Sequence, residues 1–204
     1  MPAEITLRKS DALIIVDVQR DFLPGGALAV SRGDEVVPVL NAYITLFRER
    51  GLPIIATRDW HPSDHCSFTA QGGPWPPHCV VGSQGAQFAP SLELPRDITV
   101  ISKDTQQQQS TYSGFESADL AEHLQMLGSR RLFIGGLATD YCVLNTVKDA
   151  LELDFTVFLL LDAIRAVNVK PDDGPRAEKE MRRLGALPDT LEQISPRKLP
   201  PTPF

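Results

Sequence analysis

The chain has 204 residues, of which 42% are hydrophobic and 23% charged; these values are ordinary for a globular protein and allow one domain with a sizeable core. The formal net charge is -6 and the sequence contains no basic cluster, which argues against nucleic acid and anionic membranes as partners. There is no apolar run long enough to span a bilayer, no secretory signal at the start, and an odd number of cysteines without a disulfide pattern, so we expect a cytoplasmic protein.

The chain begins with a predicted strand followed by a predicted helix. Residues 11–19 form a continuous apolar run that ends in polar residues, which is typical of a central strand in a parallel sheet. Asp17 falls at the carboxyl end of this strand. After a loop rich in proline and glycine, apolar residues at helical spacing predict an amphipathic helix over 34–50, which Gly51 closes.

Two more strands are predicted on either side of a long irregular segment. The second strand covers 53–58 and leads into Asp59. The third covers 98–101 and leads to Lys103. The segment from 62 to 90 is rich in glycine and proline, and loops of this length inside a compact domain are usually functional.

A strand, a glycine turn and a helix are predicted around a cysteine. Residues 131–134 form the fourth strand, the two glycines at 135–136 form a tight turn, and a helix follows. Thr139 or Asp140 is expected to cap this helix, which places Cys142 in its first turn. There the helix dipole and free N–H groups favour the thiolate, which is the reactive form of cysteine.

The remaining elements complete an alternation of strands and helices. Helices are predicted over 117–127 and 173–184, and a fifth strand over 155–161. Such an alternation predicts an α/β fold with three layers, in which one mostly parallel, Rossmann-like sheet has helices on both faces. We expect a single domain over 1–204, with a proline-rich C-terminal tail over 187–204.

Four chemically active side chains fall at the carboxyl ends of different predicted strands or in the turn after one: Asp17, Asp59, Lys103 and Cys142. In an open parallel sheet, the ligand crevice lies outside this edge of the sheet. We therefore expect these side chains to converge on one site.

Asp17, Lys103 and Cys142 have the chemistry of a nucleophilic site. A thiolate that attacks a carbonyl needs a group that takes up a proton and returns it to the leaving group, and a carboxylate with a raised pKa can do both. An ammonium stabilises the thiolate and the developing oxyanion. The alternative is that Cys142 is a small buried hydrophobe and that Asp17 and Lys103 form an ordinary ion pair.

Asp59, His61 and His78 have the chemistry of a metal site. Residues two apart on an extended segment point the same way, so Asp59 and His61 could share an ion, with His78 as a third ligand. One carboxylate and two imidazoles suit zinc, iron or manganese, and leave positions open for water or substrate. His65 is a further candidate. The alternative is that these are ordinary loop and core histidines; a zinc-thiolate site built on the other two cysteines lacks the usual spacing.

Four stretches of the chain match one known family in order and spacing, over nearly the whole length to about Ala186: 16–22 (VDVQRDF), 57–62 (TRDWHP), 75–80 (WPPHCV) and 136–143 (GLATDYCV). Together they resemble the nicotinamidase/pyrazinamidase branch of the isochorismatase-like cysteine hydrolase superfamily. The last stretch marks the superfamily, and the two histidine motifs narrow it to this branch. The resemblance implies an isochorismatase-like fold and the hydrolysis of nicotinamide, and also of pyrazinamide, with release of ammonia, in NAD salvage.

The resemblance also implies catalytic roles. Cys142 looks like the nucleophile that forms a thioester, Asp17 matches the general base, and Lys103 matches the third member of the triad. The backbone N–H groups of Ala138 and Cys142 look like the oxyanion hole, and the peptide bond between Leu137 and Ala138 would be cis, as in the family.

A metal ion and a ring pocket follow from the same resemblance. Asp59, His61 and His78 match the ligands of a divalent metal that contacts the pyridine nitrogen; zinc is expected first, with iron or manganese as alternatives. The family's fourth metal position varies, so His65 is left outside the expected set. The positions that match the ring pocket are Phe22, Leu28, Trp75 and Tyr112. Nicotinamide is the expected partner, and the sequence leaves a homo-oligomer open.

Two features depart from the family, and two other functions compete. Asp104 stands where the family usually has glycine after the lysine, and a glutamine tract over 106–109 follows it, so the shape of this loop is open. A cysteine hydrolase of the same superfamily that acts on a carbamoyl or ureido compound is the main alternative, but such relatives lack the metal set. A non-catalytic binding module is the other alternative, against which the intact triad argues.

Overall fold

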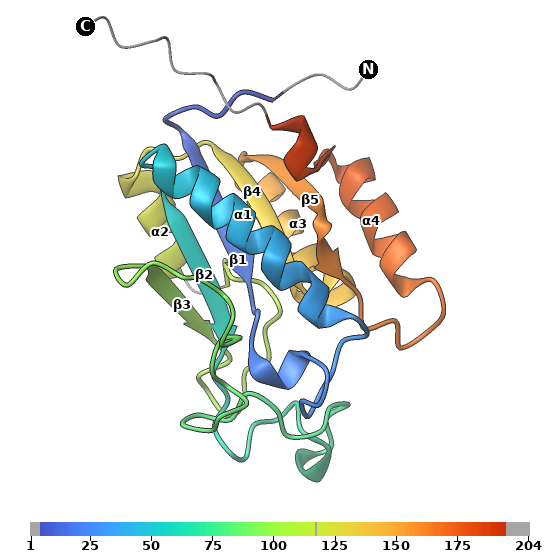
Figure 1. The fold of residues 1–204 in the computed structure, drawn as a ribbon. Helices are drawn as coiled ribbons and strands as arrows, with labels where there is room; N and C mark the ends of the chain where they lie inside the picture. The colour runs from blue at the N-terminus through green and yellow to red at the C-terminus, as the bar shows by residue number, and fades with distance from the viewer. Residues whose placement is uncertain (1–4, 117, 195–204) are drawn as a thin grey trace, which may run out of the picture.

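A six-stranded parallel sheet lies at the centre of this computed structural model, which describes residues 5–116 and 118–194 (Figure 1). The strand order is β3-β2-β1-β4-β5-β6, and each neighbouring pair is parallel. The strands are β1 (Asp11–Val16), β2 (Ile54–Asp59), β3 (Thr99–Lys103), β4 (Arg131–Leu137), β5 (Thr156–Arg165) and β6 (Leu187–Asp189). The predicted α/β class is confirmed.

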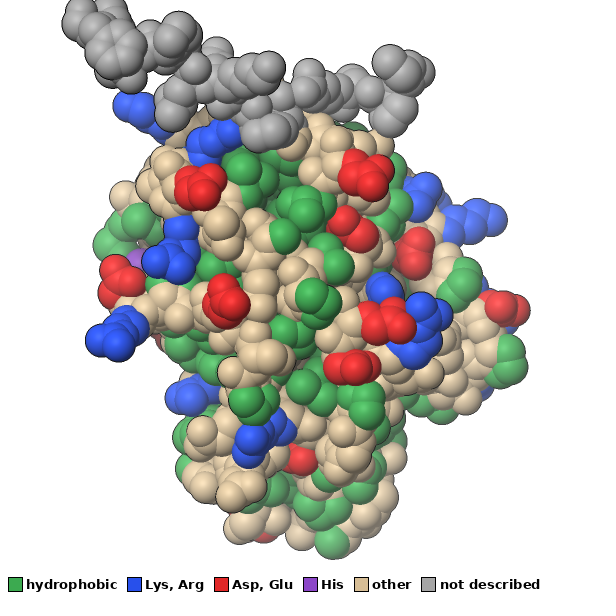
Figure 2. All heavy atoms as spheres, viewed as in Figure 1, with side chains coloured by type: hydrophobic (Ala, Val, Ile, Leu, Met, Phe, Trp, Pro, Cys, Tyr) green, Lys and Arg blue, Asp and Glu red, His purple; other side chains and the backbone are tan. Residues whose placement is uncertain are grey.

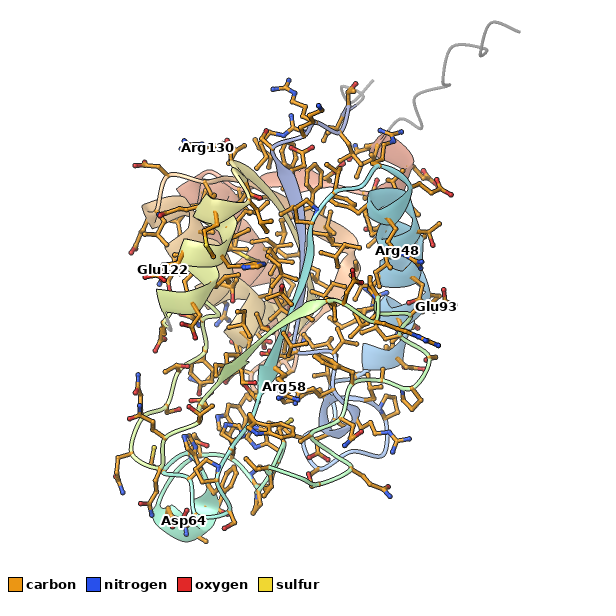
Figure 3. The ribbon with its side chains drawn as sticks, turned by 90° about the vertical axis from the view of Figure 1, so that its left-hand side faces the viewer. Arg48, Arg58, Asp64, Glu93, Glu122 and Arg130 are labelled. Carbon is orange, nitrogen blue, oxygen red and sulfur yellow. The ribbon has the colours of Figure 1, made fainter. Side chains whose placement is uncertain are left out.

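Helices cover both faces of the sheet. One face carries α1 (Val36–Glu49), and the other carries α2 (Ala118–Met126), α3 (Leu144–Glu152) and α4 (Asp173–Leu184). Figure 3 shows α1 and α2, labelled at Arg48 and Glu122, on opposite sides of the strands. Acidic and basic side chains are interspersed over the face that α1 covers (Figure 2). Within the described ranges, none of the helices combines the length and the apolar character that crossing a membrane requires.

The central strand β1 explains why its sequence is an unbroken apolar run. Leu13 and Ile15 face the core cluster under α1, whereas Ile14 and Val16 face the cluster under the other three helices. Both faces of β1 are therefore buried, and no polar alternation is possible along it. Its carboxyl end lies between β2 and β4, the point where the strand order reverses direction.

The glycine pair after the fourth predicted strand is part of that strand. β4 continues through Gly135 and Gly136 to Leu137, so the predicted tight turn is wrong. Gly136 has a φ of 127°, and a Cβ atom there would lie 2.1 Å from the carbonyl oxygen of Val16. Glycine is needed here because β1 and β4 approach each other closely, and not because the chain reverses.

The helix after β4 also begins differently from the prediction. A π-helical turn over Thr139–Val143 precedes α3, and no side chain caps it. The carboxylate of Asp140 instead accepts the backbone N–H groups of Val167 and Asn168, at 2.9 and 2.8 Å. The predicted capping role of Thr139 or Asp140 is therefore wrong, and Asp140 ties this turn to the loop after β5.

The C-terminal part of the chain adds a strand that the sequence did not predict. β6 pairs with β5, and a short 3-10 turn over Leu191–Gln193 follows it. The expectation that the tail starts at 187 is thus wrong for residues 187–194, which belong to the fold. A three-residue strand with a central proline is too short to show a period. The rest of the tail, 195–204, and the predicted helix start at residue 117 lie outside the described residues.

Candidate active site

The side chains expected to converge at the carboxyl edge of the sheet do so. Asp59 and Lys103 are the last residues of β2 and β3 and are direct partners in the parallel register. Asp17 follows β1 immediately, and Cys142 lies in the π-helical turn after β4. The long loops gather beyond these strand ends, at the bottom of Figure 1. Three of these residues come from the ends of neighbouring strands and Cys142 from the turn after β4, so the order of the strands in the sheet brings them together.

Lys103 is the centre of the candidate catalytic cluster, which consists of Asp17, Lys103 and Cys142. Its Nζ atom lies 2.9 Å from Asp17 Oδ2 and 3.5 Å from Cys142 Sγ, and it also forms an ion pair with Asp59. The Thr57 hydroxyl donates to Asp17 Oδ1 over 2.6 Å. The side chains of this cluster are buried, so their interactions are screened little by water.

Burial and neighbouring charges set the protonation states of the acid and the amine. Burial raises the pKa of Asp17 to about 6; the Lys103 ammonium opposes this rise and the Asp59 carboxylate adds to it. Burial alone would lower the pKa of Lys103, but the carboxylates of Asp17 and Asp59 hold it well above its usual value. At neutral pH, Lys103 is therefore an ammonium, and Asp17 is an ionised carboxylate with a pKa suited to moving protons.

Cys142 is a thiol at rest, contrary to the expectation from the helix dipole. Burial raises the pKa of the Cys142 thiol well above its usual value, although Lys103 opposes the shift. Desolvation of the sulfur and the nearby carboxylates outweigh the dipole of a short helical turn. The sulfur consequently needs a neighbouring base before it can attack, and a carboxylate oxygen of Asp17 lies within 4.8 Å of it.

The backbone before the cysteine has the form that the resemblance implies. The peptide bond between Leu137 and Ala138 is cis. The carbonyl of Ala138 accepts the N–H groups of both Tyr141 and Val143, at 3.1 Å each, which winds the π-helical turn. Ala138 and Cys142 therefore sit at the start of one helical segment, where backbone N–H groups have no earlier turn to bond.

Asp59, His61 and His78 form a buried group of potential metal ligands, with their donor atoms within 4.8 Å of one another. The Nδ1 atom of His61 lies 3.0 Å from the carbonyl oxygen of His78, and Nδ1 of His78 lies 2.8 Å from that of Pro76. A carbonyl only accepts, so each Nδ1 carries a proton, and in the neutral form of each ring Nε2 has the lone pair that a metal ion needs. Burial also lowers the pKa of His78, which favours the neutral ring. This donor set fits a divalent metal ion.

Gln19 and Asp21 hold the group of Asp59, His61 and His78 in place, and neither was predicted as a site residue. Gln19 bonds Asp59 on both sides: its Nε2 donates to the Asp59 carbonyl and its Oε1 accepts the Asp59 N–H, each over 2.8 Å. Asp21 Oδ2 accepts the N–H of Cys79, next to His78, over 2.7 Å. In the sequence, both could have been found as polar residues of the 16–22 motif that directly follow a buried strand.

His65 lies beside the metal group but is already satisfied. Its ring centroid is 4.5 Å from that of His61. Its Nδ1 bonds the Ser67 hydroxyl and its Nε2 bonds the carbonyl oxygen of Gln109, both over 2.8 Å. Both ring nitrogens are thus engaged, which agrees with leaving His65 outside the expected ligand set. All three cysteines of the chain are free thiols.

The expected ring-pocket residues fall into two groups. The Trp75 indole N–H donates to the Tyr112 hydroxyl over 3.0 Å, and both rings contact Tyr141, with centroids 5.0 and 5.4 Å away. Phe22 lies against His78 at a ring distance of 5.6 Å, and Leu28 packs on the core cluster that contains Phe22. Tyr141 was not predicted as a pocket residue, and in the sequence only its position next to Cys142 points to such a role.

Comparisons with known proteins agree with this geometry. A family model described as the isochorismatase domain matches residues 11–193. A nicotinamidase from Escherichia coli (strain K12) is 39% identical over 201 residues, which cover 88% of this chain and 94% of that protein.

Two solved structures share the fold along most of their length. The pyrazinamidase of Pyrococcus horikoshii in complex with zinc is 49% identical, with a TM-score of 0.86 over 89% of this chain and 99% of that one. PnC1 from L. infantum in complex with nicotinate is 40% identical, with a TM-score of 0.87 over 94% of this chain and 98% of that one. The three relatives therefore span both the sheet and the loops that hold the histidines.

Proposed function

Because this chain belongs to the isochorismatase family, we propose that it hydrolyses nicotinamide to nicotinate and ammonia, a step of NAD salvage, and that it also accepts pyrazinamide. The observation that carries the proposal is the buried contact of Lys103 with both Asp17 and Cys142, directly beside the donor set of Asp59, His61 and His78. The relatives named nicotinamidase and pyrazinamidase, and the one that binds nicotinate, support this substrate.

The first half of the reaction breaks the amide bond. Asp17 takes the thiol proton as Cys142 Sγ attacks the amide carbon, and Lys103 stabilises the negative charge that develops. The backbone N–H groups of Ala138 and Cys142 bind the oxyanion. Asp17 then gives its proton to the amide nitrogen, the C–N bond breaks, and ammonia leaves behind a thioester on Cys142.

The second half releases the acid. Water attacks the thioester carbon while Asp17 accepts one of its protons. The C–S bond breaks, the sulfur regains a proton from Asp17, and nicotinate leaves. Because the pKa of Asp17 is about 6, the same carboxyl group can accept and return a proton in each half at neutral pH.

Asp59, His61 and His78 would hold a divalent metal ion, for which we propose zinc, with iron or manganese as alternatives. When bound, this ion supplies an anchor for the pyridine nitrogen and so orients the amide toward Cys142. Phe22, beside His78, and the cluster of Trp75 and Tyr112 would enclose the ring, with Leu28 behind Phe22. The cytoplasmic location and a homo-oligomer stay predictions.

Ammonia release from three amides tests this function. Nicotinamide, benzamide, which lacks only the ring nitrogen, and a ureido compound are compared in zinc-loaded enzyme and in enzyme stripped by a chelator. We expect a large preference for nicotinamide in the loaded enzyme, which shrinks sharply in the stripped enzyme and returns when zinc, iron or manganese is added.

Two outcomes would contradict parts of the proposal. Equal rates on nicotinamide and benzamide with metal bound would contradict the anchoring of the ring. Faster release from the ureido compound than from nicotinamide would favour the carbamoyl or ureido hydrolase instead.

A further inference from the structure

Asp104 is a buried carboxylate to which the proposed mechanism gives no role. It follows Lys103 directly at the end of β3, with a left-handed φ of 55°. Only 3% of its side chain is exposed.

The two oxygens of Asp104 face different partners. Oδ1 accepts the backbone N–H of Thr111 over 2.5 Å. Oδ2 lies 3.7 Å from Nε2 of His61 and 3.8 Å from Nζ of Lys103, distances that are too long for hydrogen bonds. In the neutral ring of His61, which is the form that binds a metal ion, Nδ1 carries the proton and Nε2 has a lone pair, so that Oδ2 and Nε2 are two acceptors that face each other. A cation between them would satisfy both.

The balance of buried charge points the same way. The one ammonium of Lys103 has three carboxylates within ion-pair distance: Asp17, Asp59 and Asp104. Burial lowers the pKa of His78, so its ring adds no charge. With His61 in the neutral form that binds a metal ion, two negative charges lack a partner among the described side chains of this cluster, and uncompensated buried charge is strongly unfavourable. A divalent cation carries the charge that is missing.

His65 does not compete for this position. The donor atoms of His61, His65 and Asp104 lie within 4.8 Å of one another, but both nitrogens of His65 are engaged by Ser67 and Gln109. Of these three residues, His65 therefore has no nitrogen left for an ion, whereas Asp104 can offer Oδ2 beside Nε2 of His61.

We propose that Asp104 is a fourth protein ligand of the metal ion and binds through Oδ2, together with Asp59, His61 and His78. This inference rests on the metal site of the proposed function and deepens it. The site would then have two carboxylates and two imidazoles in place of one carboxylate and two imidazoles. The added oxygen ligand and negative charge make manganese and iron more favourable than they are for the three-residue set.

Metal titration of wild type and Asp104→Asn tests the proposal without an activity assay. Asparagine keeps an acceptor for the Thr111 N–H but loses the charge. Binding of Zn²⁺ to stripped protein is measured by calorimetry with a competing chelator, and the ligand set by the visible absorption of the Co²⁺-loaded protein. We expect the affinity of the variant to fall about 10- to 100-fold, the loss that even an outer-shell partner produces. The Co²⁺ bands should change as well.

Two further variants make the result decisive. Asp64→Asn removes an exposed carboxylate from the same loop region, where it bonds Gln107, and should leave affinity and spectrum unchanged (Figure 3). Asp104→Gly removes the side chain at a φ that glycine adopts freely and should weaken binding like Asp104→Asn. Wild-type affinity and spectrum in both Asp104 variants would overturn the ligand role alone. A wild-type protein that binds none of the divalent ions would overturn the metal site itself.

Discussion

The candidate catalytic cluster and the candidate metal group are joined by the ion pair between Lys103 and Asp59 but are held by different means. Asp17 directly follows β1 and Lys103 ends β3, so the strands fix their positions, and Cys142 lies in the π-helical turn after β4. His61 and His78 come from the irregular segment beyond β2 and are fixed by hydrogen bonds to backbone carbonyls. The strand register alone sets Lys103 beside Asp59, whereas the two loop histidines depend on hydrogen bonds to backbone carbonyls for their orientation.

Because of this difference, mutations in the two regions should have different effects on turnover and on metal affinity. A change in the catalytic cluster should remove a chemical step and leave the fold and the metal affinity in place. A change in a loop support should reduce the affinity for the metal first and turnover only through it.

The largest effect is expected for Cys142→Ala. Without the sulfur no thioester forms, so turnover of nicotinamide should fall below about 1% of wild type, since a nucleophile and its base act as a unit. Ammonia release measures the loss, and thermal unfolding and Zn²⁺ titration test whether fold and metal site persist. Mass spectrometry of wild type mixed with nicotinamide should find an adduct on Cys142.

Cys66→Ala is the matched control, because Cys66 is a free, half-buried thiol in the loop region. It should retain full activity. Substantial turnover by Cys142→Ala, or an adduct on Cys66, would assign the nucleophile elsewhere.

Asp17→Asn is expected to have the next largest effect. The amide keeps the shape of the carboxylate but cannot carry a proton between sulfur and nitrogen, so kcat should fall roughly 10²- to 10⁴-fold. Rates at saturating nicotinamide and saturating Zn²⁺ measure this loss and exclude a binding defect. A near-normal rate would place the proton transfer on another group.

The pH profile gives an independent check of this assignment. The pKa of Asp17 is about 6, raised by burial, and the base must be ionised to accept the thiol proton. Above this pH the carboxylate predominates, and below it kcat/KM of the wild type should fall about tenfold per pH unit. The residual activity of Asp17→Asn should lack this acid limb; an unchanged limb would show that a different group titrates.

A smaller effect is expected for Gln19→Ala, which acts on the metal group through Asp59. The change removes three buried hydrogen bonds, two to Asp59 and one to the carbonyl of Ala86, and leaves their backbone partners unsatisfied. We expect Zn²⁺ affinity to fall about tenfold, at the lower end for the partners of metal ligands, with activity recovered by excess metal. Chelator competition measures the affinity.

Gln108→Ala in the exposed glutamine tract is the control and should bind Zn²⁺ as wild type does. If Gln19→Ala lowers Tm but keeps wild-type metal affinity, Gln19 supports the fold and not the metal ligand.

The same contrast explains what the sequence could and could not predict. The buried strands were visible as apolar runs, and Asp17 and Lys103 follow from the rule that ligands bind at the carboxyl edge of a parallel sheet. His61 and His78 needed a family resemblance, because no periodicity connects a loop residue with its partner. Gln19 was missed because its partners are backbone atoms 40 and 67 residues away.

The wrong predictions at Gly136 and Cys142 also have their cause in residues distant in sequence. Gly136 resembled a turn residue, but the close approach of β1, a contact distant in sequence, is what requires glycine there. The thiolate expected at Cys142 rested on the helix dipole, the free N–H groups and a nearby ammonium, but burial raises the pKa of the thiol more than Lys103 lowers it. Periodicity reports local conformation, whereas both features depend on neighbours from other strands.

The short strand β6 has a consequence for where translation of this chain can safely stop. β5 is a long and largely buried strand, and β6 covers its outer edge from Phe158 to Leu160. A premature stop codon after Ala186 would expose that row of unpaired N–H and C=O groups as a template for other chains. Such a truncated product would retain every candidate catalytic and metal-binding residue, and we expect it to be lost to aggregation and not to a defect in chemistry.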